Sequence, residues 1–215
     1  RVFVSKLGKD GKIEAVVSGK YKASQNIVIR KNLLKGEYLV TVEVDWVQEV
    51  NNEVNLLAYS KANVEFYEEE VRRYDKRELY EEIMKAYFEA NGEGKDKKIR
   101  RKQVENFKVY KYKLERFGLV ALYYKNMERG MILYNRITLQ NLMNMEIFGE
   151  NNKQGEVDIE IKGGEEKVVL LKAKVMDVKN TSYAYQYSEI YKFREELTRE
   201  QLRYICKQRG QKVME

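Results

Sequence analysis

The first 66 residues alternate apolar and polar side chains with the period of two that is typical of β-strands. The clearest run is residues 37–46, which follows the turn-forming pair Lys35-Gly36. One face of this run is apolar and contains Tyr38, Val40, Val42 and Val44. The polar positions of the opposite face are Glu37, Thr41 and Glu43. We expect the apolar face, with Leu56 of the next run, to be buried and the polar face to point outward.

The period changes in residues 67–116. Asp75 and Glu78 form a capping-box pattern, and the apolar positions that follow recur at helical spacing until Asn91-Gly92, which predicts a helix over residues 76–90. Residues 95–116 then contain ten basic and three acidic side chains. We interpret this stretch as a basic connector.

Strand patterns return in residues 117–190. Residues 118–124 form a compact apolar run, residues 156–161 alternate cleanly, and residues 167–174 read as a mostly buried strand. Thr198 and Gln201 form a second capping pattern, which predicts a short C-terminal helix within residues 191–215.

The predicted fold is therefore mainly β, with some helix (α+β). Residues 1–66 form an incomplete first module, residues 67–116 a helix and basic connector, residues 117–190 a second module, and residues 191–215 the terminal helix. We expect both modules to be small antiparallel β-sandwiches.

Residues 32–40 (NLLKGEYLV), 42–46 (VEVDW) and 56–60 (LLAYS), followed by Val64, resemble the C2-like domain that follows the protease core in calpains. The Asp-Trp ending is most similar to calpain-like proteins of ciliated protists. The second β region, in residues 119–126 and 163–170, is similar to the further β module that often follows in those proteins. The resemblance implies C2-like folds and a non-catalytic scaffolding or protein-interaction role in a large intracellular assembly. From the resemblance to the ciliate proteins, we also expect a cytoskeletal setting, such as a microtubule-associated assembly or the axoneme of a cilium.

Composition narrows the chemistry further. The chain has no histidine and one cysteine, Cys206, which excludes Cys-His and Ser-His-Asp catalytic pairs and histidine zinc sites. Calpain catalysis needs a cysteine, a histidine and an asparagine, so we expect no enzyme here. The alternative is that the chain is the regulatory, calcium- or membrane-responsive part of an active calpain-type protease whose core lies elsewhere.

Cellular context is also expected from composition. A single cysteine fits a reducing intracellular compartment, the cytoplasm or cytoskeleton. No run approaches the roughly 18 apolar residues of a membrane span, so we expect no transmembrane segment. Because the chain starts at Arg1 and shows no signal-peptide pattern, we expect it to be an interior piece of a longer protein.

The candidate binding site is the basic run of the connector. Its members are Lys97, Lys98, Arg100, Arg101 and Lys102. A partner with an acidic surface, such as a tubulin lattice, would suit this run. The interleaved aromatic residues, such as Tyr110 and Tyr112, leave a nucleic-acid-binding β module as a further alternative, although no RNA-reading motif is present. A solvated linker would show the same composition.

No catalytic, cofactor-binding or metal-binding residues are predicted. A calcium site needs six to eight oxygen ligands from converging loops, and acidic residues such as Asp45, Asp158 and Glu166 are spaced like solvated strand ends instead. Most of the seventeen tyrosines alternate with Val, Leu or Lys in strand patterns, so we expect them in core and half-exposed sheet positions. Trp46 is expected to close the end of a domain.

The absence of histidine leads to a first prediction. The chain alone should not cleave casein or peptide substrates with or without calcium, because no thiolate–imidazole pair can form. A fluorogenic casein assay measures this. Calcium-dependent cleavage that disappears in Cys206→Ala would contradict the prediction.

Overall fold

A computed structural model describes residues 1–22, 26–44, 53–67, 75–92, 94–148, 155–173 and 183–195. This part of the chain is mainly β, with antiparallel sheets and one helix, α1 (Lys76–Asn91). The strands are β1 (Val2–Leu7), β2 (Ile13–Lys20), β3 (Tyr38–Val42), β4 (Arg100–Gln103), β5 (Val109–Arg116), β6 (Leu119–Asn126), β7 (Met131–Met143), β8 (Met145–Ile147), β9 (Glu156–Ile161), β10 (Glu166–Ala173) and β11 (Ala184–Glu195).

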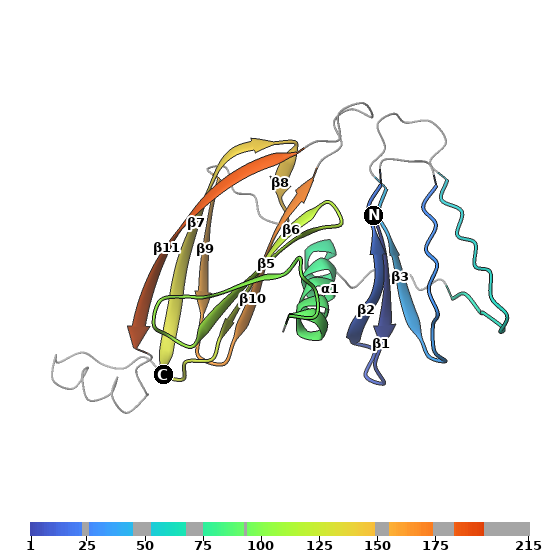
Figure 1. Cartoon of the computed structure of the whole chain (residues 1–215), viewed down its shortest axis with the longest axis horizontal. Helices are drawn as coiled ribbons and strands as arrows, with labels where there is room; N and C mark the ends of the chain where they lie inside the picture. The colour runs from blue at the N-terminus through green and yellow to red at the C-terminus, as the bar shows by residue number, and fades with distance from the viewer. Residues whose placement is uncertain are drawn as a thin grey trace.

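The strands form three sheets. Their orders are β2-β1-β3, β4-β5-β6-β10-β8 and β11-β7-β9. Figure 1 shows them as successive layers, with α1 between the β2-β1-β3 sheet and the five-stranded sheet and the β11-β7-β9 sheet on the far side. Mainly β architecture with antiparallel pairing was predicted and is confirmed.

Helix α1 forms where the sequence predicts it. The Asp75 side chain accepts a hydrogen bond from the backbone N–H of Arg77, which satisfies one of the free donors of the first turn. The helix ends as the Gly92 N–H donates to the Phe88 carbonyl. Its buried residues are Tyr80, Ile83, Met84, Ala86, Tyr87 and Phe88. This face is wide because α1 packs against sheets on two sides.

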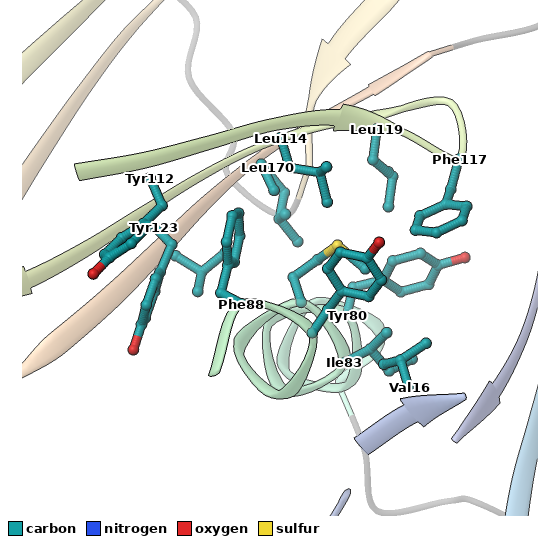
Figure 2. Close-up of a cluster of buried hydrophobic side chains, with 14 of the residues drawn as sticks. Val16, Tyr80, Ile83, Phe88, Tyr112, Leu114, Phe117, Leu119, Tyr123 and Leu170 are labelled. Carbon is teal, nitrogen blue, oxygen red and sulfur yellow. The ribbon is translucent and has the colours of Figure 1, made fainter. Parts of the chain in front are cut away.

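The first hydrophobic cluster surrounds α1. Figure 2 shows Ile83 beside Val16 of β2, while Phe88 points toward Tyr112 and Tyr123 of the five-stranded sheet. The Phe88 and Tyr123 rings are stacked with centroids 5.1 Å apart. Burying aromatic side chains of this size contributes a large share of the stabilising apolar area.

The second hydrophobic cluster lies between the five-stranded sheet and the β11-β7-β9 sheet. Strand β6 contributes to both clusters because alternate side chains point to opposite faces. Leu119, Ala121 and Tyr123 join the cluster around α1, whereas Val120, Leu122 and Tyr124 join the second one. This double burial explains why residues 118–124 read as a continuous apolar run.

The structure corrects the expectation of a basic connector in residues 95–116. Strand β4 and strand β5 occupy most of it, and β5 pairs along its full length with β6. The expected boundary after residue 116 falls in the tight turn of this hairpin, where Phe117 and Gly118 have φ of 61° and 66°. The basic residues concealed a period-two pattern, in which Tyr110, Tyr112 and Leu114 of β5 pack on the α1 side of the sheet.

The predicted orientation of β3 was wrong. Val42, Val44 and Leu56 are 37%, 41% and 47% exposed, whereas Glu43 is only 7% exposed. Thr41 lies opposite Phe3, which faces α1, so the polar face of this strand points inward. The prediction counted apolar side chains and could not include the charges that Glu43 meets in the folded chain.

The expected C-terminal helix is also partly corrected, because β11 extends through Glu195. The remaining positions of that expectation, including Thr198, Gln201 and Cys206, lie outside the described residues, as does Trp46.

A buried carboxylate connects the layers. The Glu43 side chain contacts donors from three parts of the fold: Arg1 Nη1 at 2.8 Å, Lys76 Nζ at 2.5 Å, Tyr80 Oη at 2.7 Å and Lys172 Nζ at 2.7 Å. Burial raises the pKa of Glu43, but the hydrogen bonds from Lys172, Lys76 and Tyr80 and the charge of Arg1 outweigh this and hold the pKa well below its usual range. Glu43 therefore joins the first sheet to α1 and to β10.

This cluster supports a second prediction. Glu43→Gln should lower the free energy of unfolding by about 3–5 kcal/mol, because it removes the negative charge that pairs with the buried cations of Arg1 and Lys172. Chemical denaturation measures the change. Glu37→Gln, at an exposed position just before β3, is the matched control and should change stability by less than about 0.5 kcal/mol.

The stabilising contribution of Glu43 should depend on pH, and the direction of its pKa shift gives the sign of that dependence. Because folding lowers the pKa of Glu43, its stabilising contribution is complete above the ordinary carboxyl pKa of about 4.3 and is lost as the pH falls toward the folded value. The difference between the parent chain and Glu43→Gln should therefore shrink below about pH 4. A difference that stays constant from pH 7 to pH 3 would contradict the charge argument.

Candidate binding groove and basic edge strand

Strand β5 directs basic side chains into the space between two sheets. Tyr112 and Leu114 face α1, so the alternating Lys111, Lys113 and Glu115 face the opposite way, toward β11. The space between the sheets is apolar under β6 and polar under β5.

Strand β11 presents a row of aromatic side chains to these lysines. Every second residue of the row is partly buried, and the residues between them are exposed. The partly buried positions are Tyr183, Tyr185, Tyr187, Glu189, Tyr191 and Phe193. These tyrosines occupy the half-exposed sheet positions that their alternation predicts.

An open groove of about 630 Å³ lies between the two strands. Its lining includes Lys113, Glu115, Gln140, Tyr183, Tyr185 and Tyr187. The Tyr185 and Tyr187 rings are nearly parallel, at 13°, with centroids 6.1 Å apart. Lys113 Nζ lies 5.0 Å from the first centroid and 5.1 Å from the second, within cation–π range of both. We call this the tyrosine–lysine groove.

A buried ion pair lies at the inner side of the groove. Lys111 forms a salt bridge with Glu189, and its Nζ also donates to the Tyr187 hydroxyl at 3.0 Å. Tyr124 donates to the same carboxylate. Burial raises the pKa of Glu189, but the hydrogen bonds from Lys111 and Tyr124 outweigh this and lower it overall. This network holds the aromatic face of β11 against β5.

Glu115 occupies the open side of the groove. Its carboxylate lies 2.8 Å from Lys113 Nζ and accepts a hydrogen bond from the Tyr185 hydroxyl. Burial raises the pKa of Glu115, and the hydrogen bonds from Lys113 and Tyr185 lower it below its usual range overall. Because this carboxylate is near the solvent, an anionic ligand could compete with it for Lys113. The groove therefore combines a lysine, two parallel rings and one carboxylate, and it shows no nucleophile–base pair among the described residues.

The predicted basic residues lie next to this groove, at a sheet edge. Arg100, Arg101 and Lys102 are exposed members of β4, which pairs only with β5 in the described sheet. Lys97 and Lys98 lie in the turn before it, where the Lys98 N–H donates to Asp96 Oδ1 at 2.9 Å. Among the described residues, none of these five side chains forms an ion pair.

Register decides which way each basic side chain points. Arg100 lies opposite Lys113 and Lys102 lies opposite Lys111, so both are on the groove side of the sheet. Arg101 lies opposite Tyr112 on the other face, and its guanidinium sits 4.1 Å from the Tyr110 ring centroid. The structure thus brings four cations to one face of β4 and β5. Sequence reasoning missed the groove, although the spacing of Tyr183, Tyr185 and Tyr187 was visible.

The described residues contain no group of three or more acidic, cysteine or histidine side chains that could hold a metal ion. Two carboxylates weighed as calcium ligands have cationic partners instead: Glu166 with Lys85 and Lys125, and Asp158 with Arg136. Asp45 lies outside the described residues.

The described part of the chain has no helix with the length and apolar character that crossing a membrane requires. Compared with known proteins, the chain matches no family model, no curated protein and no solved structure.

Proposed function

We propose that the chain is a non-catalytic binding module that engages an acidic protein surface through the basic edge strand β4. The observation that carries this proposal is the exposure of Arg100, Arg101 and Lys102 on a strand whose outer edge is unpaired among the described residues. Lys111 and Lys113 lie on the groove face of the neighbouring strand β5, where they pair with Glu189 and Glu115. Partner carboxylates would neutralise Arg100, Arg101 and Lys102, which are exposed to water before the partner binds.

A charged edge strand can also serve to prevent aggregation, since lysines and arginines on an edge keep sheets from pairing with one another. That explanation requires charge but no particular sign. A binding surface requires positive charge. The two explanations therefore differ in what a change of sign does.

We also propose that the module is of the calpain C2-like type and works in a large intracellular assembly, of which an axonemal or microtubule-associated one is an example. Support comes from the calpain-like segment of residues 32–46, part of which is strand β3. The runner-up is the regulatory, calcium- or membrane-responsive part of an active calpain-type protease. The resemblance to the ciliate proteins favours the scaffold over the protease.

Nucleic-acid binding is the second candidate function, and the tyrosine–lysine groove is the observation that favours it. Aromatic rings beside cations suit stacked bases and phosphates of a single strand. However, Lys113 already lies over the faces of Tyr185 and Tyr187, and Tyr185 is hydrogen-bonded to Glu115. An acidic protein partner needs no ring to be freed and is the better-supported proposal.

The third prediction tests the sign of the charge. Arg100→Glu combined with Arg101→Glu should weaken binding to microtubules and to polyglutamate by roughly 1–3 kcal/mol, with a melting temperature nearly unchanged. Co-sedimentation, fluorescence anisotropy and a melting curve on the same double variant measure these effects. Binding of the parent chain should also weaken with salt.

The matched control is Lys162→Glu combined with Lys167→Glu, which makes the same change in net charge at exposed positions of the β9–β10 turn region. It should bind like the parent chain. Equal losses in both double variants would indicate a nonspecific effect of net charge. Tighter binding to a single-stranded oligonucleotide than to polyglutamate at equal salt would favour the second candidate function instead.

A further inference from the structure

We propose that the acidic partner binds as an additional β-strand along the outer edge of β4, with consecutive acidic side chains opposite Arg100, Arg101 and Lys102. This inference rests on the proposed function and specifies its geometry. It also specifies the partner chemistry, an extended acidic peptide segment, rather than a folded acidic surface.

The first support is the free edge. β4 is the terminal strand of the five-stranded sheet and pairs with β5 alone in the described part of the chain. In an antiparallel ladder, the N–H and C=O groups of alternate residues point to opposite sides of a strand. About half of the backbone groups of β4 therefore point away from β5, where an added strand can pair with them.

The second support is the arrangement of the three cations. Arg100 and Lys102 lie on the groove face of the sheet and Arg101 on the α1 face. Directly opposite residues of an antiparallel pair share a face. A partner strand with three successive acidic residues would thus place one carboxylate beside each cation, on alternating faces. A flat acidic surface could approach only one face.

The third support is that one of these cations is already positioned. The Arg101 guanidinium lies 4.1 Å from the Tyr110 ring centroid and 5.9 Å from that of Tyr112. Packing on two rings limits its rotamers, so less conformational entropy is lost when a carboxylate binds.

The charge pattern distinguishes β4 from β11, the edge strand on the other side of the groove. β11 also pairs with only one neighbour in the described residues. It carries both signs, with Glu189 and Glu195 alongside Lys192 and Arg194, so it offers no preference for an acidic strand. β4 has three cations in four residues and no acidic side chain.

The experiment uses the full chain and a synthetic peptide, acetyl-Thr-Val-Glu-Glu-Glu-Val-Thr-amide, carrying a fluorophore. A second peptide has N-methyl groups on alternate residues, which block one edge and leave the other edge free. A third has N-methyl groups on every residue and can pair through neither edge. All three have the same charge and side chains, and anisotropy at constant salt gives their affinities.

Strand addition predicts that the peptide with one blocked edge binds within about threefold of the unmodified peptide, since it can turn its free edge to β4. The peptide with both edges blocked should bind at least about tenfold more weakly, because it loses several main-chain hydrogen bonds. Hydrogen exchange at the amides of Arg100–Gln103 should slow with the first two peptides and stay unchanged with the third.

The outcomes separate the two proposals. Equal binding of all three peptides, sensitive to Arg100→Glu combined with Arg101→Glu, would overturn strand addition and leave the proposed function standing. Binding without slower exchange in β4 would overturn strand addition too. Failure of every peptide, of polyglutamate and of microtubules to bind would overturn both.

Discussion

The central strands of the five-stranded sheet, β6 and β10, are buried on both faces, and the other layers are arranged around them. Strand β6 places Leu119, Ala121 and Tyr123 against the α1 cluster and the alternating residues against the β11-β7-β9 sheet. Removing both faces of these strands from water is a large apolar contribution to folding. Because both faces of these strands are covered by other layers, they are not available as binding surfaces. In the described part of this sheet, the edge strand β4 and the groove side of β5 remain open to solvent.

Glu43 explains why the first sheet is oriented against its own hydrophobic pattern. A carboxylate that leaves water must be compensated by cations and donors, and the α1 side of the sheet supplies Lys76, Tyr80 and Lys172. Turning β3 over would bury Val42 and expose Glu43, but it would also separate the Glu43 carboxylate from the buried cations of Arg1 and Lys172. The free energy gained by pairing the buried Glu43 carboxylate therefore outweighs the apolar burial that is lost where Val42 and Val44 are exposed.

The edge of the stack combines the features that recognition needs. Charges on β4 remain in water, so neutralising them by a partner carries a small desolvation cost. The Lys111–Glu189 pair is buried and holds β11 against β5, so its loss would disturb the groove itself. Lys113 and Glu115 lie between these extremes, in a partly exposed pair. The buried ion pair therefore maintains the packing of β11 on β5, and the exposed charges of β4 form the accessible surface.

The sequence by itself determined the elements with strong local signals. Asp75 and Gly92 mark α1 because capping depends on neighbouring backbone groups, and the runs at β6, β9 and β10 follow apolar periodicity. Residues 95–116 were misjudged because a strand buried on one face and basic on the other resembles a charged linker when only composition is counted. Only the tertiary structure decided which face of β3 is buried and which cations share a face with Lys113. These depend on strand register and on Glu43 meeting Lys172, 129 residues away in the sequence, and no local pattern encodes contacts at that separation.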